Sequence, residues 1–147
     1  MFGVDDPATV AAVRAYVKLM RAQRSVVARL EPALTACALT LTQLGVLEAV
    51  LHLGPLTHRD LGRKLLTSPG NLTDVVDKLE RRGLVERRVA LHDRRSNAIR
   101  LTAAGTTLLR KLKRQVSQHE KRLLENFSEA ERASFIALLR KVFPQHR

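Results

Sequence analysis

The feature that most limits the fold is a change of apolar period at Gly83. From Leu72 to Leu79, apolar residues recur at the i, i+3, i+4 and i+7 positions of a helix with one buried face. Beyond Gly83, apolar and polar residues alternate over residues 85–91 and again over 97–101, which is the period of a β-strand. The centre of the chain is therefore expected to be a helix followed at once by a β-hairpin.

The N-terminal end of that helix is small and polar. Ser68 suits the N-cap, and Pro69 suits the first helical position, where its missing N–H costs nothing. Thr57 and Asp60 resemble the cap of a shorter helix just before it. Two helices in this order follow the helix-turn-helix plan, in which the second helix enters the major groove of DNA. Its exposed face is expected to carry Gly70, Asn71, Thr73, Asp74, Asp77, Lys78 and Arg81.

Three of these polar residues carry groups that could read DNA. Ser68, Asn71 and Thr73 can hydrogen-bond to phosphates or base edges, and an asparagine can pair with adenine. A bulky residue in place of Gly70 would hold the helix away from the bases. The same Ser-Pro start is also ordinary capping chemistry, so it does not indicate DNA binding by itself.

The polar turn of the hairpin, residues 92–95, has a basic tip. In a winged helix, Arg94 and Arg95 would reach the neighbouring minor groove, where narrow A/T-rich DNA attracts arginine. A basic tip is also commonly a solvated turn. Asp93 either forms the turn through its side chain or pairs with Arg95 and orients the guanidinium group, and both roles are compatible.

Long helices are expected on both sides of this centre. Apolar residues recur at helical spacing over residues 10–34, in a stripe broad enough to suggest contact with a second subunit. Thr40 and Gln43 form the capping box of a helix near 42–52. Its inward residues are expected to be Leu44, Val46, Leu47, Val50 and Leu51. Later caps at Thr102 and at Ser128 with Glu131 predict a basic fifth helix and a sixth helix.

The charge balance favours a polyanionic partner. Among 147 residues, 26 Lys and Arg stand against 14 Asp and Glu, a formal net charge of +12. The basic centre contains no aromatic residue for stacking unpaired bases, which favours double-stranded DNA. No apolar run approaches the roughly 18 residues that span a bilayer, and no signal-peptide pattern is present. A cytoplasmic protein with no membrane contact is expected.

Nothing in the sequence indicates catalysis, a cofactor or a metal. The five histidines fall in no metal-ligand spacing, the glycines form no phosphate-cradling loop, and a lone cysteine excludes a Cys-rich zinc site. An enzyme is therefore not expected. Cys37 is either a buried small apolar residue or a reactive thiol, which leaves an oxidant sensor or a thiol enzyme as alternatives.

Four stretches resemble the MarR family of bacterial winged helix-turn-helix transcriptional regulators. They are LTLTQLGVLEAV, LTSPGNLTDVVDKLERRGLVERR, the wing DRRSNAIRLTAAG and SEAERASFIALLRKV. The most specific part is Asp-x-Arg at 93–95 followed by Leu-Thr. The resemblance implies a fold that is mainly α with a small β-hairpin wing, as one domain over 1–147. It also implies a winged DNA-binding lobe at about 38–101 and dimerisation helices at about 7–37 and 102–147.

The resemblance further implies a homodimer that binds a near-palindromic operator, usually as a repressor. It places Arg95 in the minor groove, Asp93 as its orienting partner and Arg94 on a phosphate. The resemblance also places Ser68, Asn71, Thr73, Asp74 and Lys78 on the side that faces the major groove. Gly70 is added to this set because a bulky residue there would hold the helix away from the bases.

Many family members bind small, often phenolic or anionic, ligands, so a small-molecule effector is expected. Cys37, Tyr16 and His52 are the candidate effector or redox residues. Family members that sense peroxides through a thiol commonly carry the cysteine within the first helix, near tyrosines. This sequence departs from that pattern, because Cys37 lies at the end of the first helix or just after it, some 20 residues from Tyr16, the only tyrosine in the chain. The first wing strand also lacks the prolines that many relatives carry before the Asp. A sequence-independent architectural DNA-binding protein stays the other alternative.

Overall fold

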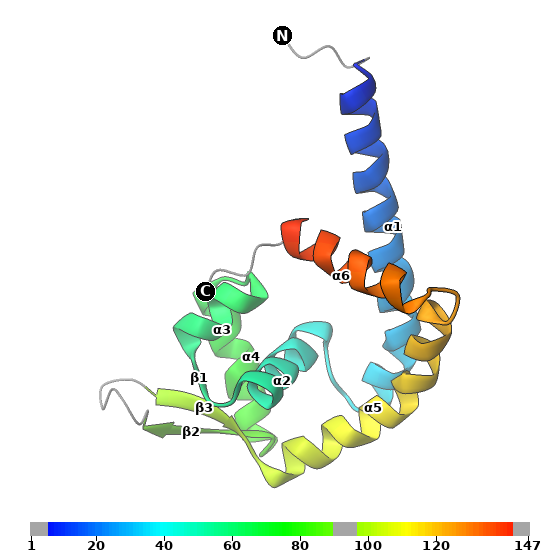
Figure 1. The fold of residues 1–147 in the computed structure, drawn as a ribbon. Coiled ribbons are helices and arrows are strands. Elements are labelled where there is room, and N and C mark those ends of the chain that lie inside the picture. The colour runs from blue at the N-terminus through cyan, green and yellow to red at the C-terminus, as the bar shows by residue number, and fades with distance from the viewer. Residues whose placement is uncertain (1–5, 90–96, 143–147) are drawn as a thin grey trace.

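The computed structural model describes residues 6–89 and 97–142, a helical protein with one small sheet (Figure 1). The order of its elements confirms the expected fold class, and the hairpin tip with Asp93, Arg94 and Arg95 lies outside the described residues. In chain order the elements are α1 (Pro7–Ala36), α2 (Leu41–Leu53), β1 (Leu56–Thr57), α3 (His58–Leu65), α4 (Pro69–Arg81), β2 (Val85–Val89), β3 (Asn97–Leu101), α5 (Ala103–Leu124) and α6 (Glu129–Val142).

Helices α2 to α6 begin at the predicted caps, whereas the cap of α1 at Asp6 was not predicted. The Thr40 hydroxyl accepts a hydrogen bond from the Gln43 backbone N–H at 3.2 Å, and the Gln43 amide oxygen accepts one from the Thr40 N–H at 2.9 Å. The Ser68 hydroxyl accepts from the Asn71 N–H at 3.4 Å. Such bonds satisfy N–H groups that have no partner within the helix. The caps predicted at Thr57, Thr102, Ser128 and Glu131 are also confirmed.

A core of aliphatic side chains holds α2, α3, α4, α5 and the sheet together. Its largest fully buried members are Leu47, Leu61, Leu72, Leu79, Ile99, Leu109, Val46, Val76 and Val85. The prediction that Leu51 points inward is wrong, since 38% of its surface is exposed. The buried stripe of α2 consists of Gln43, Val46, Leu47 and Val50, so Leu51 falls at its edge.

The sheet has three antiparallel strands in the order β1-β3-β2. Ile99 in the central strand is fully buried and lies between Leu56 of β1 and Arg87 of β2. The hairpin of β2 and β3, which we call the wing, was predicted from its alternating pattern. β1 was not predicted, because two residues are too few to show a period.

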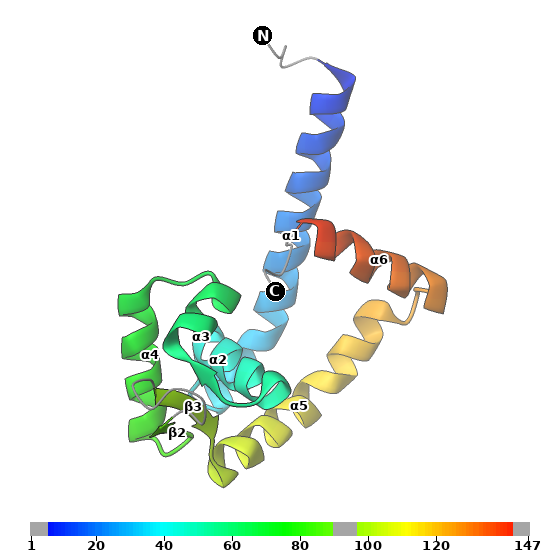
Figure 2. The same ribbon diagram turned by 60° about the vertical axis from the view of Figure 1, so that its left-hand side comes forward.

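The N-terminal half of α1 projects away from the winged lobe (Figures 1 and 2). In α1 only Leu34 is buried, and none of the residues of α6, all of which the structure describes, is buried. Within the described residues no single helix is long and apolar enough to cross a membrane, and α1 and α2 meet the criteria of length and composition only as a pair bent by 86°.

Candidate nucleic-acid interface

The helix α4 has two chemically distinct faces. Leu72, Val75, Val76 and Leu79 are buried in the core, as their spacing predicted. The predicted DNA-binding residues Ser68, Gly70, Asn71, Thr73, Asp74 and Lys78 are all exposed. An added Cβ at Gly70 would meet no atom within 4 Å. Among residues 6–89 and 97–142, no other element therefore obstructs the N-terminal end of α4 at Gly70.

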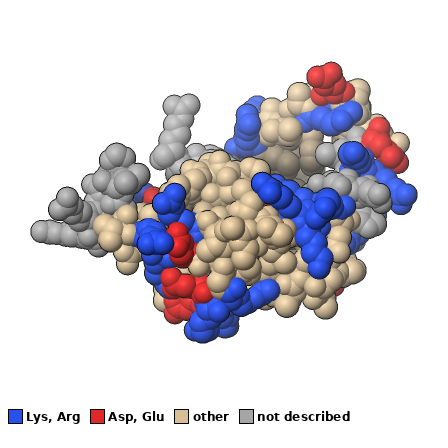
Figure 3. Space-filling model, turned by 90° about the horizontal axis from the view of Figure 1, so that it is seen from below, with Lys and Arg blue, Asp and Glu red and all other residues tan. Residues whose placement is uncertain are grey.

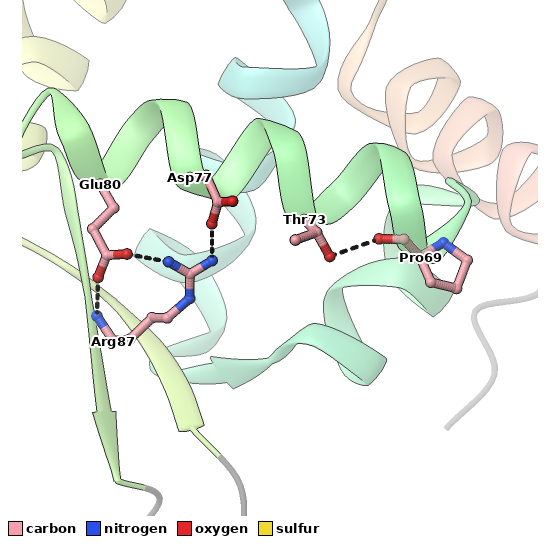
Figure 4. Close-up of polar contacts among 5 residues, drawn as sticks. All are labelled: Pro69, Thr73, Asp77, Glu80 and Arg87. Atoms are coloured by element: carbon pink, nitrogen blue, oxygen red, sulfur yellow. Dashed lines mark hydrogen bonds and ion pairs between the residues drawn. The ribbon is translucent and has the colours of Figure 1, made fainter.

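The polar side chains on this face form hydrogen bonds within α4 or to its N-terminal turn. The Asn71 amide donates to the Thr67 hydroxyl at 2.8 Å. The Thr73 hydroxyl donates to the Pro69 carbonyl at 3.0 Å (Figure 4). Asn71 retains a second amide N–H and its amide oxygen, and Thr73 retains acceptor capacity. These residues are consequently held in fixed directions while keeping groups free for a further bond.

A hollow of about 640 Å³ lies between α3 and α4, beside the exposed face of α4. Arg59 and Arg63 reach it from α3, and Arg87 reaches it from β2. Guanidinium groups match the geometry of phosphate oxygens, so Arg59 and Arg63 are the residues here suited to bind a phosphate group, whereas Arg87 is paired with Asp77 and Glu80. Its full lining is His58, Arg59, Gly62, Arg63, Thr67, Pro69, Leu72, Thr73 and Arg87.

Arg87 ties the wing to α4 through two carboxylates. Its guanidinium group forms ion pairs with Asp77 and with Glu80, which lie one turn apart on α4 (Figure 4). The Arg87 backbone N–H also donates to a Glu80 carboxylate oxygen at 3.1 Å. Desolvation by burial works to lower the pKa of Arg87, but the two carboxylates outweigh it and raise that pKa above its ordinary value.

His58, the first residue of α3, lies beside this ion-pair cluster. Its Nε2 is buried and has no hydrogen-bond partner within the part of the chain that the structure describes. Burial, followed by the positive charge of Arg87, lowers the pKa of His58 below its ordinary value of 6.5 against the opposing influence of Asp77 and Glu80. Folding therefore favours the neutral imidazole of His58 relative to the unfolded chain.

We expect acid to destabilise the lobe through His58. Because its folded pKa is below the unfolded value of 6.5, the unfolded chain binds the proton more readily. The stability contributed by neutral His58 is thus fully present above pH 6.5 and is lost as the pH falls toward the folded pKa. His58→Gln should reduce the fall in melting temperature between pH 7.5 and pH 5.5. An unchanged profile in His58→Gln would contradict this origin of acid sensitivity.

The surface of α5 carries a second basic region. Figure 3 shows a group of Lys and Arg side chains on the side of α5 with no acidic side chain within it on that face. The exposed basic residues of α5 are Arg110, Lys111, Lys113, Arg114, Lys121 and Arg122. Such a surface raises the local positive potential that speeds association with DNA.

The three candidate effector or redox residues do not form one cluster within the chain. Cys37 caps the C-terminus of α1 and is only 5% exposed. Tyr16 is exposed on α1, about 30 Å away along the helix. His52 lies on the surface of α2, with Glu48 at 2.8 Å and Lys113 at 3.3 Å. Among the described residues there is no group of three or more His, Cys, Asp or Glu that could hold a metal.

Sequence reasoning missed the arginines that surround α4. Arg59 and Arg63 are spaced four apart on α3, which places them on one helix face. Arg87 stands between Val85 and Val89 in the alternating pattern, so a charged residue there indicates an acidic partner on the neighbouring element. Asp77 and Glu80, three residues apart on α4, are that partner. These spacings are the features of the sequence from which the arginines around α4 could have been predicted.

The succession α3, α4 and wing is that of the winged helix-turn-helix class of DNA-binding proteins. The chain matches the model of the MarR family over residues 39–96. It is 33% identical over 97 residues to the HTH-type transcriptional regulator MhqR of Bacillus subtilis, covering 66% of this chain and 67% of MhqR. It is 35% identical over 107 residues to the uncharacterized HTH-type transcriptional regulator YkoM of the same organism, covering 71% of this chain and 70% of YkoM. The chain belongs to the MarR family and is a transcriptional regulator.

Solved structures share the fold over most of its length. A MarR family transcriptional regulator from Silicibacter pomeroyi superposes with a TM-score of 0.79 at 26% identity, covering 90% of each chain. NadR in complex with 4-hydroxyphenylacetate has a TM-score of 0.79 at 23% identity, covering 86% of this chain and 89% of NadR. CouR from Rhodococcus jostii, bound to p-coumaroyl-CoA, has a TM-score of 0.79 at 24% identity, covering 97% of this chain and 96% of CouR.

Proposed function

We propose that the protein is a homodimeric cytoplasmic repressor that binds a near-palindromic operator and is released by a small-molecule effector. The observation that carries the proposal is the polar N-terminal end of α4, which no other described element obstructs, beside a hollow that Arg59 and Arg63 line from α3. Two copies of α4 would enter successive major grooves on one side of the duplex, with centres roughly 34–36 Å apart.

Each DNA-contacting residue has a distinct role in this proposal. Asn71 and Thr73 lie at the base edges, and Arg59 and Arg63 bind phosphates of the same half-site. Beyond the described residues, Arg95 enters the minor groove with Asp93 orienting it, and Arg94 binds a phosphate. The remaining proposed contacts of α4 are Ser68, Gly70, Asp74 and Lys78.

The apolar surfaces of the terminal helices support the dimer. Val13 is 56% exposed and Tyr16 is 63% exposed on the projecting half of α1. Phe135, Ile136 and Leu138 are exposed on α6. Monomeric proteins rarely leave contiguous apolar patches of this kind in water, so a second copy that covers both helices is the partner we propose.

A phenolic compound is the effector class that we propose. The support comes from NadR with 4-hydroxyphenylacetate and CouR with p-coumaroyl-CoA, which share this fold. An effector that binds more tightly to a dimer with a different distance between the two α4 helices would shift the population away from DNA. A thiol-based response through Cys37 is the alternative, although its burial favours a packing role.

Operator preference and the wing are tested together. The protein should bind the DNA upstream of its own gene at least roughly 10³-fold more tightly than a scrambled duplex of equal length, as measured by fluorescence anisotropy.

Arg95→Ala should weaken binding to this upstream DNA about tenfold or more, because it removes the minor-groove contact. The dimer should stay folded by circular dichroism. Equal binding of wild type to both duplexes at two salt concentrations would instead favour an architectural binder or an operator elsewhere.

The two sides of the interface should respond differently to substitution. Arg63→Ala should weaken binding to every duplex about equally and lower the salt dependence by about one unit of slope, since it removes a phosphate contact. Asn71→Ala should instead change which base is preferred at one operator position. Binding to a set of single-base operator variants measures both effects. An equal loss on all of them for Asn71→Ala would make Asn71 a phosphate contact only.

A further inference from the structure

We propose that Arg87 is a positioning residue that locks the wing to α4, so that the wing and α4 meet DNA as one rigid unit. The link between the wing and α4 can be tested without DNA, whereas its effect on DNA binding rests on the proposed function. Its basis is the set of contacts that Arg87 makes with Asp77 and Glu80 (Figure 4).

β2 depends on side chains for its placement against α4. Within the part of the chain that the structure describes it is an edge strand, because the sheet order is β1-β3-β2 and β3 is its one neighbour there. Arg87 satisfies one backbone group of this free edge, since its N–H donates to a Glu80 carboxylate oxygen at 3.1 Å. Its guanidinium group adds a side-chain link by bridging Glu80 and Asp77. A bidentate arginine held in this way fixes both the distance and the direction of the strand.

The lock lies at the point where β2 leaves the core. Val85 at its start is buried, whereas Val89 at its end is 61% exposed. Arg87 is 24% exposed, and among the described residues of β2 it is the last one found bonded to α4. The proposed minor-groove residues Arg94 and Arg95 follow shortly afterwards in the sequence. Arg87 therefore fixes β2 against α4 just before the chain continues to the proposed minor-groove residues.

Charge gives the lock a second consequence. Asp77 and Glu80 place two negative charges on α4, next to a hollow that we assign to DNA phosphates. The positive charge of Arg87, which is paired with both carboxylates, offsets their repulsion of the DNA phosphates. Loss of Arg87 should therefore both release the wing and expose two carboxylates to DNA, whereas loss of another surface arginine should do neither.

Arg88 is the matched control. It is the next residue of the same strand and carries the same charge, but it is 65% exposed and pairs with Glu86 of its own strand at 3.0 Å. Arg87→Gln and Arg88→Gln therefore remove one positive charge each from the wing. A difference between the two variants measures the link to α4 rather than net charge.

The first experiment measures the lock without DNA. Hydrogen exchange followed by mass spectrometry should show that Arg87→Gln speeds exchange over residues 85–101 at least about fivefold, with α1 and α5 unchanged. Arg88→Gln should match the wild type. Arg87→Lys should be intermediate, because an ammonium group cannot bridge both carboxylates in the arginine geometry. Wild-type exchange in Arg87→Gln would overturn the proposal.

The second experiment tests the consequence for DNA by combining each variant with Arg95→Ala on the operator duplex. Arg95→Ala should weaken binding about tenfold or more in the wild-type and Arg88→Gln backgrounds but less than about threefold in Arg87→Gln, because an unlocked wing has little contact to lose. An equal loss in all three backgrounds would overturn the positioning role. If Arg95→Ala has no effect even in the wild-type background, the proposed wing contact fails, and the exchange experiment still decides whether the lock exists.

Discussion

Gly105→Ala is expected to lower the melting temperature by roughly 10 °C, because overpacking at this site should cost about 3 kcal/mol. Gly105 is buried in the first turn of α5, where the helix presses on the wing. An added Cβ would overlap the Leu84 carbonyl oxygen and would lie 3.1 Å from the Leu84 carbonyl carbon and 3.2 Å from Leu101 Cγ. Two of these three neighbouring atoms belong to backbone, which cannot move aside as a flexible side chain can.

The junction around Gly105 is fastened by Thr102, which increases the expected effect. The Thr102 hydroxyl donates to the Gly83 carbonyl at 2.6 Å, and the Thr102 N–H donates to the Leu84 carbonyl at 3.1 Å. Displacing α5 to make room for a methyl group would break these bonds.

Gly70→Ala is the matched control for this prediction. Gly70 is also in the first turn of a helix, but its surroundings are open. Alanine there should leave the free energy of unfolding unchanged or raise it by up to about 1 kcal/mol through helix propensity. Thermal unfolding followed by circular dichroism compares the two variants with the wild type. Equal melting temperatures for Gly105→Ala and Gly70→Ala would show that the contact at Leu84 relaxes at little cost.

Local chemistry explains which parts of the fold could be predicted from the sequence. The start of α4 depends on Ser68 and Pro69, and the start of α2 on Thr40 and Gln43, all within one helical turn. A cap is decided by neighbours in the chain, so it is visible in the sequence. The wing was predictable for the same reason, since its alternation follows directly after Gly83, whose φ of 66° ends α4.

The features that were missed depend on contacts between distant elements. The partner of Arg87 is decided by how β2 lies against α4, and the hollow of Arg59 and Arg63 exists only once α3 and α4 are packed. Gly105 looks like a weak helix residue until α5 is placed on the backbone of Leu84. The exposed face of α4 was predicted correctly except for Asp77, which is partly buried against Arg87. The restraint of this face by the wing and its basic neighbours were tertiary properties.

Leu138→Glu is expected to convert the proposed dimer to a monomer and to weaken operator binding roughly hundredfold or more, because one half-site alone cannot supply two linked contacts. Leu138 is 58% exposed on α6, and no residue of that fully described helix is buried within the protomer. If a second copy covers this face, a glutamate at its centre would leave a charge buried without a partner. Val13→Glu on α1 should act in the same way.

Sedimentation velocity measures the association state, and fluorescence anisotropy measures the operator affinity of the same samples. Ala137→Glu is the control, since it adds the same charge at an exposed neighbouring position outside the apolar stripe of Phe135, Leu138 and Val142. Hydrogen exchange over α4 and the wing separates dissociation from unfolding, because the winged lobe has its own core and should stay protected in a monomer. A dimeric Leu138→Glu protein with wild-type affinity would exclude α6 from the interface and would leave its apolar face to another partner.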